Sequence, residues 1–305
     1  MTDFSFHHLA PYMETIKNAS PSVLAVAGAE DLEVLATVKA ATEYGLVMPI
    51  LFGNGDEVER LVAQAGMNSE DIQIENTDNP SLAAARAVGG GEADVLMKGL
   101  VSSGAFLRAV LSDKAGLREG SLLSHIGFFD IATHSSLLGM TDGGINIRPD
   151  FSQKIAIVKN AVKFGRRVLG RPPRIALLAA VENVQESMPV TLEWAAIAKM
   201  AERGQLGEAE VEGPLGLDNA IDPQAAKTKG LTSSVAGRAD IVVVPDIHAG
   251  NLMGKTLTFL ARAPMAGVVV GARAPIVLNS RADSARARFA SIVLACAAAL
   301  TAGGA

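Results

Sequence analysis

The chain has 305 residues, of which 49% are hydrophobic and 4% aromatic, and 27 Lys and Arg against 32 Asp and Glu give a formal net charge of −5. This length and apolar content suffice for one large globular domain or two smaller ones, and the acidic balance gives no reason to expect nucleic acid or a membrane as a partner. The single cysteine, Cys296, excludes an internal disulfide and a multi-cysteine metal site. Because we see no secretory signal and no apolar run of membrane-spanning length, we expect a soluble, cytoplasmic protein.

From residue 23 onward, short runs rich in β-branched residues alternate with helical patterns. We predict strands over 23–28, 47–53, 72–77 and 94–99, each followed by a helix, over 31–45, 56–66, 80–88 and 103–111. Four strand–helix units in succession indicate a parallel sheet with right-handed crossovers. Ligands of such sheets bind beyond the carboxyl ends of the strands.

The alternation breaks over residues 118–150, which we interpret as extended strands and loops crossing between two lobes. It then resumes with strands over 174–181, 209–214 and 240–246, helices over 151–169, 189–203, 222–230 and 250–263, and a last helix from about 283. The predicted fold is therefore α/β with two lobes, residues 1–145 plus 275–305 and residues 146–274.

Two places in the first half of the chain hold candidate binding or catalytic residues. Lys98 stands at the carboxyl end of a predicted strand, where anions bind, and Arg108 in the next helix could bind the same anion. The sequence agrees equally well with a solvated loop lysine and a water-facing arginine. Ser124 and His125 suggest a nucleophile and its base, but neighbouring residues of a strand point to opposite faces, which disfavours that pair.

The stretch "TDGGINIRPD" places Asp142 and Asn146 between or beside glycines. Such side chains commonly close turns through hydrogen bonds to the backbone. Asp142 could also supply an oxygen ligand to a divalent cation together with Asp218 and Asp246, which are all at predicted strand ends, but spacing alone does not show convergence. None of the five histidines has metal-ligand spacing, and we expect no bound metal.

In "VVVPDIHAGNLMGKTL" a buried strand ends at Asp246 and a small-residue turn leads into a helix. If the helix begins at Gly250 and Asn251, their free N–H groups would point at a phosphate, with Lys255 further along. The spacing is one residue too short for a P-loop, and no GxGxxG fingerprint follows the first strand, which disfavours a nicotinamide-binding Rossmann domain.

The stretch "PIVLNSRADSARARF" precedes the last helix. Ser280 would serve as the N-cap of that helix, with Asp283 as the acidic half of a capping box. Capping does not explain the cations Arg281, Arg286 and Arg288, because positive charge near a helix N-terminus opposes the helix dipole. These arginines therefore indicate an anion site.

Taken in order, "ADVLMKGLVSS", "SLLSHIGFFD", "MTDGGINIRPD", "EGPLGLDNAI", "ADIVVVPDIHAGNLMGKTL" and "PIVLNSRADS" resemble motifs of the phosphate acetyltransferase and phosphate butyryltransferase family, from about residue 20 to 300. The start of the chain and its length look more like the butyryl branch. The resemblance implies a two-lobed fold like that of isocitrate and isopropylmalate dehydrogenases, with a cleft between the lobes. It also implies reversible transfer of a short acyl group between coenzyme A and phosphate, with coenzyme A as a substrate and no cofactor.

In the family reading, Ser280 hydrogen-bonds the thioester carbonyl and Arg281 holds the phosphate. The family's later aspartate, which deprotonates the coenzyme A thiol, is missing, so either Asp283 is the base or the thiol ionises beside the arginines. A milder departure is Glu212, where the family has aspartate. Substrate contacts are expected at Lys98, Arg108, Ser124, His125, Asp142, Asn146, Asp246, Asn251, Lys255, Arg286 and Arg288.

Two other functions stay open from the sequence. One is a metal- and NAD(P)-dependent oxidative decarboxylase of a 2-hydroxy acid, which has the same lobes. The other is a non-catalytic domain that senses acyl-CoA. We expect a homodimer or a larger homo-oligomer.

Overall fold

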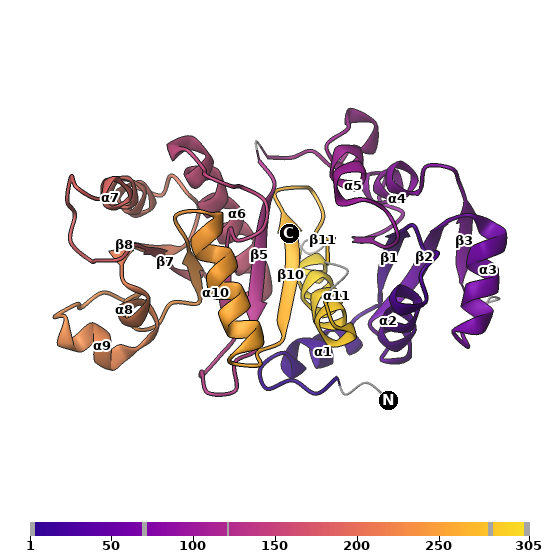
Figure 1. Ribbon diagram of the computed structural model, residues 1–305, viewed down its shortest axis with the longest axis horizontal. Helices are drawn as coiled ribbons and strands as arrows, with labels where there is room; N and C mark the ends of the chain where they lie inside the picture. Colours follow the sequence, from indigo (N-terminus) through magenta and orange to yellow (C-terminus); the bar gives the residue numbers. More distant parts are fainter. Residues whose placement is uncertain (1–3, 69–71, 121, 280–282, 302–305) are drawn as a thin grey trace. The chain divides into compact units, whose positions relative to one another are not determined.

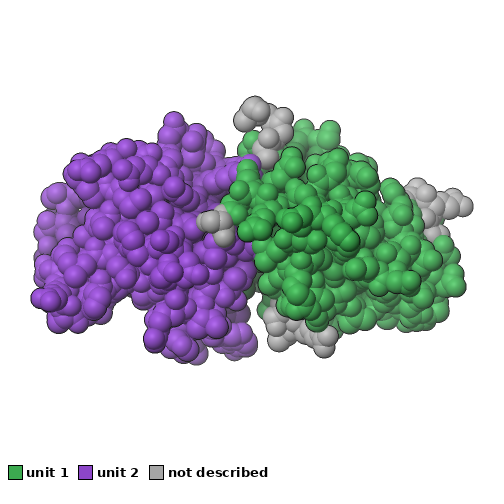
Figure 2. All heavy atoms as spheres, turned by 90° about the horizontal axis from the view of Figure 1, so that it is seen from above, with its two compact units in different colours: residues 1–120, 264–305 green, residues 121–263 purple. Residues whose placement is uncertain are grey.

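The computed structural model describes residues 4–68, 72–120, 122–279 and 283–301. The chain divides into two compact units, residues 1–120 with 264–305 and residues 121–263 (Figure 2). These boundaries differ from the predicted ones at 145 and 275. The first differs because the strands before residue 145 pair with strands of unit 2, and the second because the strand after residue 264 packs on the last helix of unit 1.

Unit 1 is an α/β layer structure whose strands run in the order β3-β2-β1-β4-β11-β10 (Figure 1). Among its described residues, the pairings β1–β2, β1–β4, β2–β3 and β4–β11 are parallel, and that of β10 with β11 is antiparallel. Its strands are β1 (Ser22–Ala27), β2 (Val47–Gly53), β3 (Gln73–Asn76), β4 (Val95–Lys98), β10 (Met265–Val270) and β11 (Ile276–Val277). Its helices are α1 (Ala10–Lys17), α2 (Leu32–Glu43), α3 (Gly55–Gln64), α4 (Pro80–Gly89), α5 (Ser103–Val110), the short 3₁₀ turn η2 (Asp113–Ala115) and α11 (Ala285–Leu300).

Unit 2 has the strand order β5-β6-β9-β7-β8, in which only the β5–β6 pair is antiparallel. Its strands are β5 (Ser124–Phe129), β6 (Leu138–Thr141), β7 (Arg174–Leu178), β8 (Glu210–Leu215) and β9 (Ile241–Val243). Its helices are α6 (Phe151–Leu169), α7 (Pro189–Glu202), α8 (Leu217–Ile221), α9 (Pro223–Thr228) and α10 (Ile247–Phe259). Both units have helices packed on a mainly parallel sheet, which confirms the predicted α/β class.

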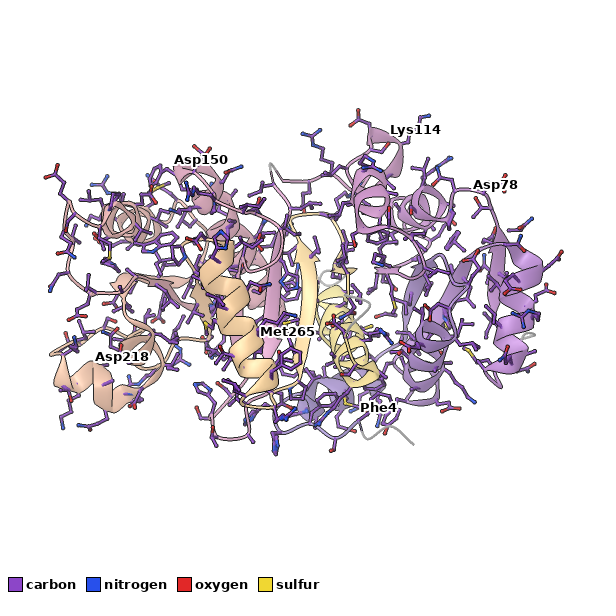
Figure 3. All side chains as sticks on the ribbon, viewed as in Figure 1. Phe4, Asp78, Lys114, Asp150, Asp218 and Met265 are labelled. Atoms are coloured by element: carbon purple, nitrogen blue, oxygen red, sulfur yellow. The ribbon has the colours of Figure 1, made fainter. Side chains whose placement is uncertain are left out.

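Local sequence signals explain where many elements begin and end. Asp150 lies at the start of α6 (Figure 3). Its carboxylate accepts the Gln153 N–H while the Gln153 side chain accepts the Asp150 N–H, and this capping box starts α6 at the predicted residue. Gly170 ends the same helix in the left-handed conformation, with φ of 66°. Within α2, Leu35 and Val38 are fully buried, whereas Leu32 and Thr42, at the same three- and four-residue spacing, are exposed.

Two predictions about helix starts were wrong, and two helices were missed. The helix predicted over 250–263 begins at Ile247 because Asp246 is its N-cap. The helix expected from about 283 begins at Ala285, and its N-cap is Ser284, whose Oγ accepts the Ala287 N–H at 3.2 Å, rather than Ser280. The helices α1 and α8 were not predicted at all.

Candidate functional site

The carboxyl ends of β4 and β11 form one edge of the unit 1 sheet. These strands are parallel neighbours with Val277 opposite Met97, so Lys98 and the segment after Val277 leave the sheet at the same edge. Lys98 is 9% exposed, and its Nζ donates to the carbonyl oxygens of Gly99 at 3.1 Å and Val101 at 3.0 Å. The ammonium is therefore a fixed positive charge at this edge and not a solvated loop lysine.

The predicted catalytic pair Ser280 and Arg281 lies outside the described residues. Asp283 stands one position before the N-cap Ser284, so it is not the acidic half of a capping box. Instead its Oδ2 accepts a hydrogen bond from Nδ2 of Asn279 at 3.2 Å. Sequence reasoning did not single out Asn279, although its place at a parallel strand's carboxyl end was a usable signal.

The two arginines in α11 have partners within unit 1. Arg288 has a side chain only 8% exposed, and its Nη2 lies 2.7 Å from the Glu33 carboxylate. Arg286 donates to the Ser5 carbonyl, and its guanidinium lies 5.0 Å from the centre of the Phe6 ring. These contacts account for both cations without a bound anion, which removes much of the reason for assigning them to a substrate site.

Arg108 has a different environment. It is exposed in the last turn of α5, and no other residue in the described part of the chain makes a hydrogen bond or ion pair with it. It is therefore available to an anion, but no contact in the structure directs it to one.

In unit 2 the carboxyl ends of the parallel strands β6 and β9 lie next to each other, and Asp142 directly follows β6. Asp142 is 3% exposed. Its carboxylate accepts the N–H groups of Gly144 at 2.8 Å, Ile145 at 2.9 Å and Asn146 at 3.2 Å, and the Asn146 side chain at 2.6 Å. With four donors, this carboxylate closes the turn, so the interpretation as a turn residue fits better than a metal ligand.

The N-terminus of α10 packs on that turn. A Cβ placed on Gly250 would lie 2.6 Å from the Cα of Gly143, so two glycines are needed for this close backbone approach. The Asp246 carboxylate accepts the Ala249 N–H at 3.0 Å, and the Gly250 N–H donates to the Asp246 carbonyl at 3.2 Å. The prediction of a free Gly250 N–H at the helix start was therefore wrong, because the helix starts three residues earlier.

Two further predicted residues of α10 lie on its exposed side. Asn251 is exposed in the helix, past the N-terminal positions that would leave an N–H unbonded. The Nζ of Lys255 lies 5.6 Å from the centre of the Phe259 ring. Neither residue has a contact that identifies a ligand.

Ser124 and His125 have separate neighbours in unit 2. Ser124 is fully buried and its Oγ accepts a hydrogen bond from Nδ2 of Asn160 in α6 at 3.0 Å. The His125 ring packs against Gly144, where a Cβ would lie 3.0 Å from the ring Cγ. This arrangement supports the argument against a nucleophile–base pair.

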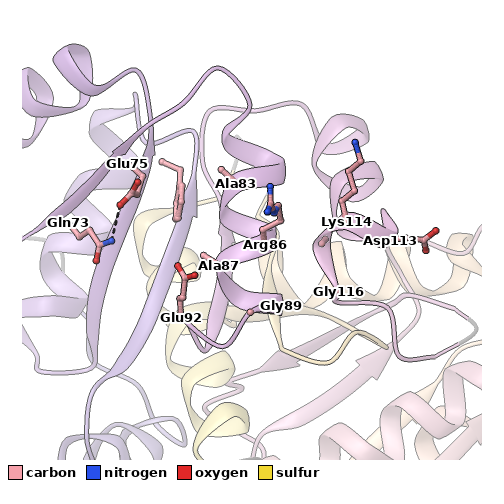
Figure 4. Close-up of a pocket in the computed structure, with 13 residues that line it drawn as sticks. Gln73, Glu75, Ala83, Arg86, Ala87, Gly89, Glu92, Asp113, Lys114 and Gly116 are labelled. Carbon is pink, nitrogen blue, oxygen red and sulfur yellow. Dashed lines mark hydrogen bonds between the residues drawn. The ribbon is translucent and has the colours of Figure 1, made fainter.

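A pocket of about 570 Å³ opens in unit 1 beside α4, β3 and η2 (Figure 4). Its charged lining residues are Glu75, Arg86, Glu92, Asp113 and Lys114. No predicted site residue lines it, so its size alone does not make it the active site.

The described part of the chain has neither a metal-binding cluster nor a membrane-spanning helix. It contains no group of three or more His, Cys, Asp and Glu side chains placed to hold a metal ion. No helix among the same residues is long and apolar enough to cross a membrane.

Known proteins similar in sequence to this chain are phosphate acetyl- and butyryltransferases. A family model described as "Phosphate acetyl/butaryl transferase" matches residues 55–296. The phosphate butyryltransferase of Clostridium acetobutylicum is 42% identical over 283 residues, which cover 92% of this chain and 94% of the relative. The phosphate acetyltransferase of Rhizobium meliloti is also 42% identical, over 90% of this chain and 88% of the relative.

Solved structures agree with these sequence matches. A branched-chain phosphotransacylase from Enterococcus faecalis superposes with a TM-score of 0.80 at 29% identity, covering 91% of this chain and 99% of that chain. The 4-hydroxythreonine-4-phosphate dehydrogenase of Klebsiella pneumoniae shares the fold, with a TM-score of 0.59 at 14% identity over 92% of this chain and all of that chain.

Proposed function

The chain belongs to the phosphate acetyl- and butyryltransferase family, and we propose on that basis that it transfers a short acyl group reversibly between coenzyme A and phosphate. The acyl group is butyryl or acetyl, because relatives of both names are equally similar. The structural observation that best supports this function is the parallel pairing of β4 with β11. It brings the buried cation of Lys98 to the same sheet edge as the segment that continues to Ser280 and Arg281.

The reaction needs no cofactor in this proposal. Phosphate, held by Arg281, attacks the carbonyl carbon of the thioester, and Ser280 donates a hydrogen bond to the oxygen on which negative charge develops. The carbon–sulfur bond then breaks, giving acyl phosphate and the coenzyme A thiolate, which takes up a proton. In the reverse direction the thiol must lose that proton, either to Asp283 or by ionising without a protein base.

The remaining substrate contacts stay proposals, and their support differs. Lys98 is supported by its fixed charge at the sheet edge, and Arg108 by its lack of a partner among the described residues. Asp246, Asn146 and Asp142 are supported only as residues that close turns at the strand ends of unit 2, next to Ser124 and His125. Asn251 and Lys255 lie on the exposed side of α10, and no contact in the structure supports them further.

We further propose that the chain works in the cytoplasm as a homodimer or larger homo-oligomer. Leu252, Phe259 and Leu260 of α10 and its C-terminal end are 70%, 59% and 81% exposed, and an apolar row of this kind is typical of a subunit interface. Multi-angle light scattering of the wild type and of Leu252→Lys tests this proposal. A monomeric wild type contradicts it.

The decisive assay measures thiol release from acetyl-, butyryl- and branched acyl-CoA, with and without phosphate. Release that depends on phosphate supports the transferase. Reduction of NAD or NADP with a 2-hydroxy acid and a divalent ion would instead support the decarboxylase. Binding of acyl-CoA without turnover in either assay would support the sensor domain.

A further inference from the structure

The turn that follows β4 presents an exposed leucine close to the buried ammonium of Lys98. Leu100 stands two positions after Lys98 and is 48% exposed. The other exposed large apolar side chains in the described part of unit 1 are those of Leu32, Tyr44, Met48 and Leu111. Of these, Leu32 follows the carboxyl end of β1, which is one strand farther from β11 than β4 is. Among these five side chains, Leu100 is thus the one that follows a strand next to β11.

The backbone of this turn is fixed on both sides of Leu100. The Leu100 N–H donates to the Gly28 carbonyl at 2.6 Å, and the Val101 N–H donates to the Gly99 carbonyl at 3.0 Å. The Val101 carbonyl in turn accepts a hydrogen bond from the Lys98 ammonium at 3.0 Å. A Cβ on Gly99 would lie 2.0 Å from the Gly28 oxygen, so this close approach needs glycine. A single exposed leucine is ordinary on a protein surface, but this one is held on a rigid turn at the strand end.

The acyl chain is the apolar group attached to the carbon that reacts. Inorganic phosphate has no apolar surface, and the proposed function places the thioester carbonyl at the sheet edge where Lys98 ends its strand. We propose that Leu100 contacts the acyl chain of the substrate and determines which chain length is preferred. The inference rests on the proposed function. A butyryl group has two more methylene groups than an acetyl group, so apolar contact with Leu100 favours the longer chain.

The test compares kcat/KM for butyryl-CoA with kcat/KM for acetyl-CoA, measured as phosphate-dependent thiol release. In Leu100→Ala the butyryl-to-acetyl ratio should fall by about 3- to 15-fold relative to the wild type, the upper value being complete loss of contact with both methylene groups. The value for acetyl-CoA should itself change by less than about twofold. Leu100→Met keeps the volume and the apolar surface, and its ratio should stay within about twofold of the wild type.

Leu111→Ala is the matched control. Leu111 is 47% exposed and is the C-cap of α5, the helix that follows the Leu100 turn, so the substitution removes the same atoms from an equally exposed leucine. Its ratio should equal that of the wild type. The melting temperature of each variant, followed by circular dichroism, shows whether it is folded. If Leu100→Ala does not fold, Leu100→Asn takes its place, because asparagine has a similar shape without the apolar surface.

Three results overturn the inference. They are a Leu100→Ala ratio that stays unchanged or rises, a fall of the same size in Leu111→Ala, and a loss in Leu100→Ala that is equal for both thioesters. In each case the wild type still releases thiol when phosphate is present, so the proposed function stands. A wild type without phosphate-dependent thiol release from any acyl-CoA overturns the proposed function instead, and this inference with it.

Discussion

Replacing Asp240 by Asn should destabilise unit 2. The Asp240 side chain, at the start of β9, is 5% exposed, and its carboxylate accepts hydrogen bonds of 2.7 to 3.2 Å from Arg171 and Arg174. Breaking a buried ion pair costs about 3–5 kcal/mol. The two arginine side chains are 46% and 29% exposed, so water replaces part of their bonding. We therefore expect Asp240→Asn to lower the free energy of unfolding by about 2–3 kcal/mol at pH 7.

Trp194 makes this loss measurable in unit 2 by itself. It is the chain's one tryptophan, lies fully buried in α7, and donates from Nε1 to the Leu178 carbonyl at 2.8 Å. Its fluorescence during a urea titration therefore reports the unfolding of unit 2. Glu208→Gln is the control, because the Arg166–Glu208 pair of 2.7 Å is 47% and 70% exposed and should contribute less than about 1 kcal/mol.

The pH dependence gives a second check on the same variant. Burial by itself would raise the pKa of Asp240, but the hydrogen bonds from Arg171 and Arg174 outweigh burial and hold that pKa below its ordinary range. A carboxyl with a lowered folded-state pKa adds stability that is present above about pH 4 and is lost as pH falls through the folded-state pKa. The stability difference between the wild type and Asp240→Asn should therefore shrink below about pH 4. A difference that stays constant there, or a loss under about 1 kcal/mol at pH 7, refutes the reasoning.

Three other outcomes follow from named residues. Ser280→Ala should lower kcat by about 10- to 1000-fold without changing the melting temperature. Ser284→Ala, which removes the N-cap of α11, should instead lower the free energy of unfolding by about 1 kcal/mol. Full activity of Ser280→Ala contradicts the catalytic role of Ser280. Burial raises the pKa of Glu212, whose Oε2 has no partner among the described residues. Its ionised form is therefore disfavoured in the folded state. In urea titrations, Glu212→Gln should raise the free energy of unfolding by at most about 1 kcal/mol at pH 8, and should leave it unchanged at pH 4. Burial also raises the pKa of the Cys296 thiol in α11 to about 12. A thiol reagent should therefore label the native protein far more slowly than the urea-unfolded protein. Fast labelling of the native protein would show that α11 opens.

Elements whose limits depend on neighbouring residues were predictable from the sequence. The strand over 47–53 and the helix over 151–169 have the predicted bounds, because turn and capping residues next to them act within a few positions. The starts of α10 and α11 were not predictable in this way. Each start has more than one polar candidate for the N-cap within about five residues, and the apolar spacing alone does not choose between them. The start of α10 at Ile247 places Gly250 against Gly143, which lies more than 100 residues earlier in the chain, and spacing within the helix does not show this approach.

The same distinction explains why the candidate site was predicted only in part. The sequence locates polar residues at strand ends, but it does not give their partners. Arg288 pairs with Glu33 across 255 positions, and this pairing, not a bound anion, balances its charge near the start of α11. Asp142 and Asp283 look alike as acidic residues beside small ones, yet the first closes its own turn whereas the second is bonded to Asn279.

The role of Asp283 therefore depends on its partners more than on its residue type. The side chain that donates to Asp283 is fixed by Ser291, which sits in the core of unit 1. A general base must lie within hydrogen-bond reach of the proton that it takes, and a carboxylate that also accepts a hydrogen bond from a fixed partner can reach fewer positions. If Asp283→Asn keeps its activity, the coenzyme A thiol must lose its proton without this carboxylate, and the search for what lowers the thiol's pKa moves to the cations Lys98, Arg108 and Arg281.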